Sequence, residues 1–322
     1  MFRKIISLAV CCSLGTCVLA GCSSAEAVNK NDRKKIVCTV FSAYDWVKEI
    51  IGENTADFEI TYLLGNGSDM HSYQPTMDDM VKISSCDLFI YIGGESDQWA
   101  ESAVKQAKNK NMKAISLLDS LGSHAKTEEY KKGMEYDDDE NSEPEFDEHI
   151  WLSLGNAEIL CGAVADAISD IDPYNSAEYS ANLDTYTEKL QALDSDYKSA
   201  LSDVKEKTLI FGDRFPFRYL TDDYGLDYYA VFSGCSAETE ASFETITFIA
   251  DKINELGTEN IFTIEGSDFS VAEAIISATE SKNQNIITLD SIQSVTEKQA
   301  ENGTSYLSVM RENLDVLKEV LN

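Results

Sequence analysis

Short apolar runs alternate with amphipathic segments through most of the chain. In the first half, four runs rich in Ile, Val, Leu and aromatic residues predict buried strands at 35–41, 58–64, 87–94 and 113–118. Between these runs, helical spacing predicts helices at 46–51 and 77–83, and Trp99 opens a further one. Strands that alternate with helices are typical of an α/β domain with a mostly parallel sheet.

A long amphipathic helix follows. Apolar residues recur every three or four positions from Ser176 to about Lys205, which at 1.5 Å per residue predicts a rod of roughly 45 Å. Its single apolar stripe fits either packing along two domains or a coiled-coil dimer. A helix over 156–171 precedes it, and Asp172-Pro173 ends that helix.

The α/β pattern then resumes. Strands are predicted at 208–211, 260–265 and 285–291, and a closing helix begins near Ser305. We therefore predict two α/β domains, each a mostly parallel β-sheet flanked by helices, joined by one long rigid helix. The predicted parts are a signal peptide at 1–21, a tether at 22–35, an N-terminal domain at 36–172, a linker helix at 173–206 and a C-terminal domain at 207–322.

The N-terminus predicts the location of the protein. Arg3 and Lys4 precede a short apolar run, and Leu19-Ala20-Gly21-Cys22 follows it, as in a secretory signal. The last four residues resemble the bacterial lipobox, which makes Cys22 the predicted lipidated first residue of the mature chain. We expect an extracytoplasmic protein, lipid-anchored to the outer face of the cytoplasmic membrane, with the residues after Cys22 as a flexible tether.

Charge narrows the possible partners. The chain has 57 acidic against 26 basic residues and a formal net charge of −31, which argues against nucleic acid or an anionic membrane as a partner and favours a partner that is a cation or is indifferent to charge. An acidic surface that serves solubility alone is the alternative. Within the first domain, residues 121–147 form an acidic insert that we expect to lack fixed structure. It either raises the local concentration of cations or is a tolerated insertion.

The chain contains three histidines, so their positions matter. His71 lies in a loop rich in Gly and Pro after a predicted strand, where ligands of α/β folds tend to bind. His149 stands between a run of carboxylates and the apolar Ile150-Trp151-Leu152, which fits either a metal ligand or an ordinary half-buried histidine. His124 lies in a polar stretch and is expected to face solvent.

Four cysteines remain beyond Cys22, and no two of them form a C-x-x-C pair. We expect buried free thiols, although an extracytoplasmic disulfide is possible. These residues are Cys38, Cys86, Cys161 and Cys235.

Two histidine motifs carry a family resemblance. Gly67 to Thr76 reads Gly-x-x-x-His-x-Tyr-x-Pro-Thr, and Asp147 to Leu152 reads Asp-x-His-x-Trp-Leu. In this order, the motifs and strands resemble the zinc/manganese-binding proteins of ABC importers over essentially the whole mature chain. Glu148 departs from the pattern, because the family usually has proline there.

The resemblance implies a metal site of two histidines and two carboxylates, namely His71, His149, Asp213 and Asp290. Asp213 substitutes for the family's third ligand, a His or Glu, although one extra residue separates it from Tyr219. Arg214 could instead neutralise Asp213. Glu265 is an alternative or supporting carboxylate. Imidazole suits zinc and carboxylates also accommodate manganese, so Zn²⁺ is the favoured ion and Mn²⁺ the alternative.

The implied function is high-affinity capture of a divalent metal between two domains and its delivery to a cognate ABC permease by a monomeric binding protein that is not an enzyme. Two other classes were considered. A secreted metal-dependent hydrolase is disfavoured because no H-E-x-x-H, G-x-S-x-G or P-loop motif occurs. A surface adhesin or interaction lipoprotein is known in the family, but no residue pattern supports that role here.

Overall fold

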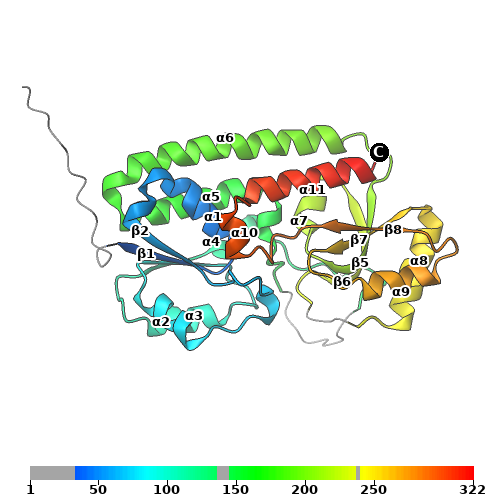
Figure 1. Cartoon of the computed structure of the whole chain (residues 1–322), viewed down its shortest axis with the longest axis horizontal. Coiled ribbons are helices and arrows are strands. Elements are labelled where there is room, and N and C mark those ends of the chain that lie inside the picture. Colours follow the sequence, from blue (N-terminus) through cyan, green and yellow to red (C-terminus); the bar gives the residue numbers. More distant parts are fainter. Residues whose placement is uncertain (1–32, 136–144, 237–239) are drawn as a thin grey trace, which may run out of the picture.

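The computed structural model describes residues 33–135, 145–236 and 240–322. Two four-stranded sheets form its framework, with strand orders β2-β1-β3-β4 and β6-β5-β7-β8, and every pairing within them is parallel. Helices flank both sheets (Figure 1). The predicted fold class is confirmed. The predicted signal peptide, Cys22 and most of the tether lie outside the described residues.

The N-terminal half closely follows its hydrophobic pattern. Its strands are β1 (Lys34–Cys38), β2 (Phe58–Tyr62), β3 (Leu88–Tyr91) and β4 (Lys113–Ser116). Its helices are α1 (Phe41–Ile51), α2 (Met77–Ser85), α3 (Trp99–Gln106), α4 (Leu117–Leu121) and α5 (Leu154–Ile171). Strand β1 begins two residues before the predicted domain boundary.

The C-terminal half contains elements that were not predicted, among them strand β6 and helix α9. Its strands are β5 (Thr208–Phe215), β6 (Asp227–Ser233), β7 (Asn260–Ile264) and β8 (Asn285–Leu289). Its helices are α7 (Arg218–Tyr224), α8 (Phe243–Leu256), α9 (Ser270–Ala278) and α10 (Glu297–Glu301). None of the helices in the described part of the chain has the length and apolar composition needed to cross a membrane.

Helix α6 (Ser176–Leu201) runs along both halves, and the terminal helix α11 (Tyr306–Val320) lies beside it from the junction over the second half (Figure 1). The apolar stripe of α6 is buried within this chain, in a hydrophobic cluster that reaches from Ile36 in the first sheet to Leu289 in the second. Because one continuous core joins the two sheets, we expect their relative movements to be small.

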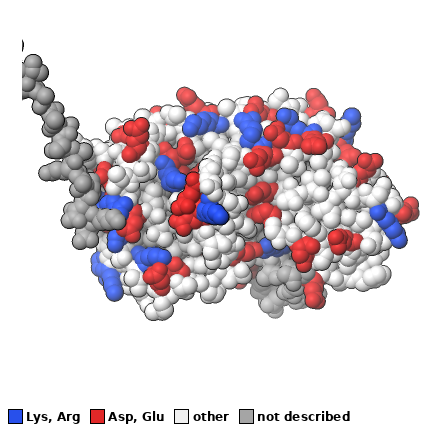
Figure 2. Space-filling model, in the orientation of Figure 1, with Lys and Arg blue, Asp and Glu red and all other residues white. Residues whose placement is uncertain are grey.

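Acidic side chains lie over both halves of the visible face, interleaved with Lys and Arg (Figure 2). On this face, the acidic side chains are spread out rather than gathered in one patch (Figure 2).

Part of the predicted acidic insert is ordered, so the expectation of disorder is wrong for residues 122–135. We call residues 125–135 the strap. Its backbone joins the second sheet through the Glu135 N–H and the Val231 carbonyl oxygen, at 2.8 Å. Three strap side chains add contacts on the same domain, because Lys126 pairs with Asp222, Lys131 with Asp227, and Glu129 accepts a hydrogen bond from the Tyr228 hydroxyl. The carboxylate run at 136–144 lies outside the described residues.

Two tyrosines on the buried side of α6 differ in whether their hydroxyl groups are hydrogen-bonded. The Tyr197 hydroxyl donates to the Met310 carbonyl oxygen, whereas the Tyr186 hydroxyl has no hydrogen-bond partner among the described residues. Since an unsatisfied buried hydroxyl is destabilising, we expect Tyr186→Phe to raise the free energy of unfolding by about 1 kcal/mol and Tyr197→Phe to lower it by about 1 kcal/mol. Urea denaturation measures both, and equal losses in the two variants would contradict this assignment.

Candidate metal centre

His71 is positioned by the loop that follows β2. The short helical turn Met70–Ser72 begins at Asp69, whose Oδ1 accepts the His71 backbone N–H at 2.9 Å. The other carboxylate oxygen of Asp69 pairs with Arg214 of β5, so the loop is tied to the opposite domain. The His71 side chain is only 4% exposed, and its Nδ1 lies 2.8 Å from Ser96 Oγ.

His149 is positioned by Asp147. One carboxylate oxygen, Oδ1, lies 2.9 Å from both the backbone N and the ring Nδ1 of His149. An ionised carboxylate only accepts hydrogen bonds, so this contact places a proton on Nδ1, and in the neutral ring Nε2 then has the free lone pair. The ring is fully buried and packs edge-on against Trp151.

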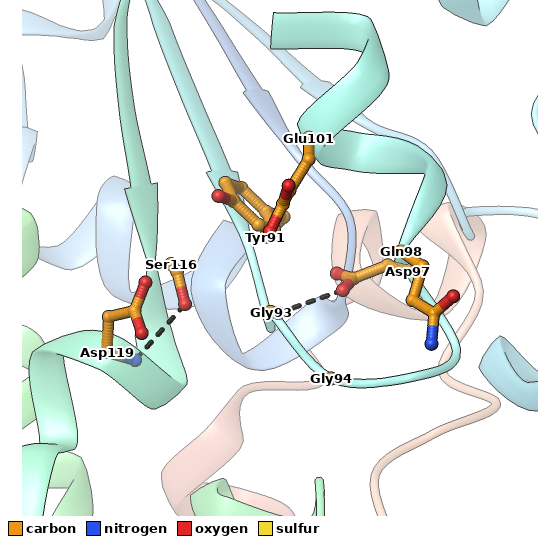
Figure 3. A pocket seen from close by; sticks show the side chains of 8 residues that line it. All are labelled: Tyr91, Gly93, Gly94, Asp97, Gln98, Glu101, Ser116 and Asp119. Atoms are coloured by element: carbon orange, nitrogen blue, oxygen red, sulfur yellow. Dashed lines mark hydrogen bonds between the residues drawn. The ribbon is translucent and has the colours of Figure 1, made fainter.

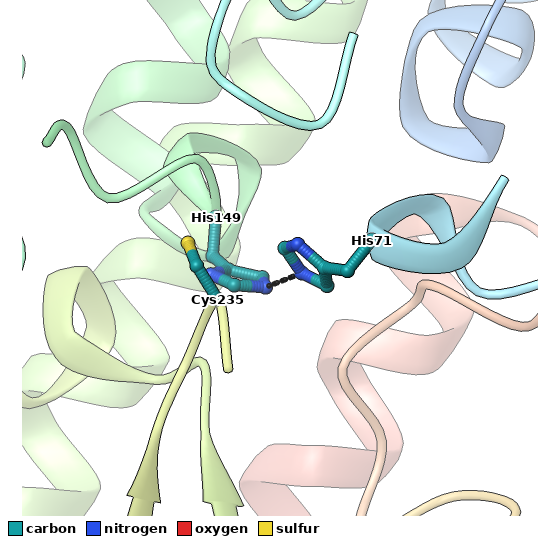
Figure 4. A group of neighbouring side chains, drawn as sticks. All are labelled: His71, His149 and Cys235. Carbon is teal, nitrogen blue, oxygen red and sulfur yellow. Dashed lines mark hydrogen bonds between the residues drawn. The ribbon is translucent and has the colours of Figure 1, made fainter. Parts of the chain in front are cut away.

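The two imidazoles converge on one point. His71 Nε2 and His149 Nε2 are 3.1 Å apart (Figure 4). Two nitrogen ligands of a tetrahedral zinc ion, with bonds of 2.0–2.1 Å, lie about 3.3 Å apart, so the observed spacing fits two donors to one ion. The pair predicted from the two histidine motifs is therefore brought together.

The pKa values of the two histidine rings are shifted in opposite directions. Burial and the neighbouring charge of His149 lower the pKa of His71 to about 3, which keeps its ring neutral at physiological pH. Burial alone would also lower the pKa of His149, but the hydrogen bond and charge of Asp147 outweigh it and raise that pKa above its usual value.

Cys235 completes a group of three donors. Its Sγ and the ring nitrogens of His71 and His149 all lie within 4.8 Å of one another (Figure 4). The cysteine occupies the turn that follows β6, and Gly234 lets this turn approach the His149 ring closely, because a Cβ there would lie 3.0 Å from Nδ1. Sequence reasoning treated Cys235 as an unassigned thiol. Recognising β6 would have placed it at the carboxyl end of a strand, beside the predicted ligands.

Asp213 lies near the pair but outside this close group. It lines the same cavity as His71, a space of about 590 Å³ between the Gly67–Ser72 loop and the second sheet. Its Oδ1 accepts the backbone N–H of Arg214 and its Oδ2 that of Ile264. The Arg214 guanidinium pairs with Asp69, so in this structure it forms an inter-domain contact rather than an ion pair with Asp213.

Asp290 and Glu265 organise the loop after β8. Glu265 accepts hydrogen bonds from the Ser291 hydroxyl and from the backbone N–H groups of Ser291, Gln293 and Ser294. Asp290 is held through its backbone by Asn313, and its Oδ1 accepts the Ile292 N–H. Burial and the nearby Glu265 raise the pKa of Asp290 to about 7. Glu265 lines the cavity, whereas Asp290 is not among its lining residues.

Glu148, the departure from the family pattern, is buried behind His71. Its Oε1 accepts the Ser96 backbone N–H at 2.8 Å, and burial raises its pKa. Its Oε2 accepts no hydrogen bond from the described residues and lies 3.6 Å from His71 Nδ1. Gly94 leaves the space for this carboxyl, because a Cβ there would lie 2.1 Å from Oε1.

A second cavity, of about 400 Å³, lies at the carboxyl ends of β3 and β4 (Figure 3). Carboxylates line it, among them Asp97, Glu101 and Asp119, without a histidine or cysteine. Asp97 accepts the backbone N–H groups of Ile92 and Gly93, and burial raises its pKa to about 7. We interpret Asp97 as a structural residue that fixes the turn next to Glu148.

Two sheets, each of parallel strands, with two imidazoles that converge between them define the class of protein. It is a two-domain binding protein with a candidate metal site at the domain junction. The family model described as ZnuA, zinc-uptake complex component A, periplasmic, matches residues 36–320. The chain belongs to this family.

Individual relatives of this chain are named as zinc-binding or zinc-uptake proteins. The zinc-binding lipoprotein AdcA of Streptococcus pneumoniae (TIGR4) is 30% identical over 98% of this chain and 61% of its own length. AdcA of Streptococcus pyogenes (MGAS315) is 28% identical over 92% of this chain and 58% of its own length. The chain thus spans about three-fifths of these curated relatives. ZnuA of Bacillus subtilis is 25% identical and matches end to end.

Solved structures show the same fold. The Zn(II)-bound ZnuA-like domain of S. pneumoniae AdcA matches with a TM-score of 0.70 at 26% identity, over 90% of this chain and 99% of that domain. The laminin-binding protein Lmb of Streptococcus agalactiae matches with a TM-score of 0.72 over 90% of this chain and all of Lmb, but at 22% identity it shows the fold alone.

The close approach of Gly234 to His149 gives a test of the site. A Cβ at Gly234 would lie 2.9 Å from the Phe215 carbonyl oxygen and 3.0 Å from His149 Nδ1, so Gly234→Ala is expected to displace the ring and weaken Zn²⁺ binding roughly 10- to 100-fold. Gly162 in α5 has open space, so Gly162→Ala is the matched control. It should leave Zn²⁺ affinity unchanged and stabilise the protein by about 0.5–1 kcal/mol. Competition with a chromophoric chelator measures the affinities, and unchanged binding in Gly234→Ala would refute the constraint.

Proposed function

We propose that this protein captures Zn²⁺ outside the cytoplasmic membrane and delivers it to the permease of an ABC importer, with Mn²⁺ as the alternative ion. The observation that carries the proposal is the pair of buried Nε2 atoms, 3.1 Å apart at the junction of the two domains. The zinc-binding relatives and the Zn(II)-bound AdcA domain support the choice of ion.

Geometry favours binding over catalysis. The two imidazoles are almost completely excluded from water, at 4% and 0% exposure. A catalytic zinc keeps an open position for a water molecule and needs a nearby base to act on it. Fully buried donors are instead suited to surrounding an ion and holding it, so we propose that the protein is not an enzyme.

We retain the predicted carboxylates as candidate ligands. Asp213 lines the cavity beside His71, and Asp290 follows a strand whose carboxyl end lies on the same edge of the second sheet. Glu265 supports them by holding the loop after β8. Two imidazoles with one or two anionic donors would neutralise much or all of the charge of a divalent ion.

The location and partners follow from the N-terminal sequence and the family. We propose that Cys22 carries the lipid anchor and that residues 36–172 and 207–322 act as two binding domains around the linker helix at 173–206. The pneumococcal relative is named a lipoprotein, which agrees with this anchor. The partner is the permease, and we expect the binding protein to act as a monomer.

Release of the ion then requires only a small movement. His71 comes from a loop of the first sheet, while Asp213 belongs to the second. Because one hydrophobic core and two long helices connect the sheets, a wide hinge opening would expose much apolar surface. A shift of one or two ångströms between the sheets is enough to separate the donors.

Removing either imidazole tests the function directly. We expect His71→Ala and His149→Ala each to abolish tight Zn²⁺ binding, because each removes one of two converging donors. The wild-type protein should gain about 2.7 kcal/mol of stability when free Zn²⁺ is 100 times the dissociation constant, and neither variant should gain it. Thermal unfolding with and without Zn²⁺, together with elemental analysis, measures both effects.

His124 provides the control, since it is exposed and lies outside the site. His124→Ala should bind Zn²⁺ and gain stability like the wild type. Stoichiometric zinc in the His71→Ala/His149→Ala double variant would overturn the proposed function.

A further inference from the structure

We propose that Cys235 is the third donor to the captured ion, and that its thiolate makes the site selective for thiophilic ions such as Zn²⁺ over Mn²⁺. This inference rests on the proposed function and assigns a ligand that the family resemblance does not supply. In that resemblance the third position belongs to a residue at the end of β5, where this chain has Asp213.

The three donors come from three separate segments that meet at the domain junction. His71 follows β2, His149 precedes α5, and Cys235 follows β6. Their donor atoms lie within 4.8 Å of one another. With zinc bonds of about 2.3 Å to sulfur and 2.0–2.1 Å to nitrogen, the corresponding S···N spacing is about 3.6 Å. A movement of the donor atoms by about 1 Å would therefore place them at three corners of a tetrahedron around one ion.

Cys235 differs in its surroundings from the other three described cysteines. Cys38 and Cys161 belong to the main hydrophobic cluster and Cys86 to a smaller one, where each packs as a small apolar side chain. Cys235 belongs to no hydrophobic cluster of the described residues and is half-buried, whereas the other three are buried. A cysteine placed among polar donors is poorly explained as a packing residue.

The neighbours of Cys235 are acidic. The charges of Glu128, Asp147 and Glu148 all act on the thiol. Among the described residues, none of these carboxylates forms an ion pair with Lys or Arg. A divalent cation at the three donors would neutralise the thiolate and offset the surrounding negative charge. Without a cation, the same arrangement repels a thiolate.

The strap fixes the turn that carries the thiol. Glu128 Oε1 accepts the Cys235 backbone N–H at 2.9 Å. The Gly234 backbone meanwhile passes close to the His149 ring, so the turn is held from both sides. Glu128 is therefore a positioning residue, and the insertion that contains it has a structural role in the site.

Asp213 is less suited to the third position. Both of its carboxylate oxygens already accept backbone N–H groups, one from Arg214 and one from Ile264. Moving this side chain to the imidazoles would leave those two groups unpaired, whereas the Cys235 Sγ is already in the group.

A thiolate ligand affects which metal ion the site prefers. Thiolate favours Zn²⁺ and similar thiophilic ions, whereas Mn²⁺ prefers carboxylate, carbonyl and water oxygens. When the ion binds, the Cys235 thiol loses its proton to solvent and a sulfur–metal bond forms, and each imidazole binds through an unprotonated Nε2.

Cobalt substitution tests the assignment. Co²⁺ replaces Zn²⁺, and a thiolate ligand gives an intense near-ultraviolet charge-transfer band that oxygen and nitrogen ligands do not give. The experiment uses the chain from Ser23 onward, which contains every described residue. We expect the band in the wild type and in the control Cys86→Ser, and its loss in Cys235→Ser.

Affinity measurements complete the test. Cys235→Ser should weaken Zn²⁺ binding at least about tenfold, with a much smaller change for Mn²⁺. Cys235→Asp, a second variant that keeps an anionic donor, should lose the band and bind Mn²⁺ relatively better than the wild type does. Glu128→Gln should weaken Zn²⁺ binding but keep the band, as expected for a positioning residue.

The outcomes separate this inference from the proposed function. If the two histidine variants lose zinc while Cys235→Ser keeps the wild-type affinity and cobalt spectrum, Cys235 is not a ligand and the capture function stands. If the histidine variants bind zinc normally, the proposed function itself fails, and the inference that rests on it fails too.

Discussion

Two buried imidazole nitrogens held 3.1 Å apart are the constraint on which the rest of the structure depends. Such a contact is stable only if one nitrogen carries a proton or a cation lies between them. Asp147 accepts the Nδ1 proton of His149 and raises the pKa of that ring, so without a metal one of the two rings must supply a proton between the Nε2 atoms. To bind a metal, both Nε2 atoms must be free of protons, so a neutral His71 must carry its proton on Nδ1. There, Ser96 Oγ lies 2.8 Å away and the unpaired Oε2 of Glu148 lies 3.6 Å away. Glu148, unusual for the family, thus stands where the metal-binding tautomer needs an acceptor.

This contact requires the two halves of the protein to keep a fixed relative position. The segment that carries His149 is fastened from the second half, because Trp151 Nε1 donates to the Ser291 carbonyl oxygen at 2.9 Å. The Tyr219 hydroxyl donates to the Asp147 carbonyl oxygen, and the Tyr306 hydroxyl of α11 to that of Trp151. His149 therefore moves with the domain junction rather than with one sheet. The continuous core beneath α6 and α11 keeps the junction at a nearly fixed spacing.

The sequence predicts those parts of the site that local patterns encode. Both histidine motifs are local, each with an Asp two residues before the His, and the structure places that Asp as a support for its histidine in both cases. Cys235 could not be found in this way, since its role depends on which strand stands next to β5, and β6 was not recognised. The strap was mistaken for a disordered insert because its carboxylates find their partners on distant strands. Glu128 and Cys235, for example, are 107 residues apart. Long-range pairings of this kind leave no periodic signal in the chain.

The acidity of the insert also takes on a different meaning. Residues 126 and 128 pair through their backbones with residues 147 and 145, so the strap lies directly beside the segment of Asp147 and His149. Burial raises the pKa values of both Glu128 and Glu148, which shows that negative charge here is costly in the absence of a cation. A divalent ion bound as we propose would lower this cost, because it would supply the positive charge that no described Lys or Arg brings to these carboxylates. In the function that we propose, the ion would offset this unfavourable charge and contact both domains.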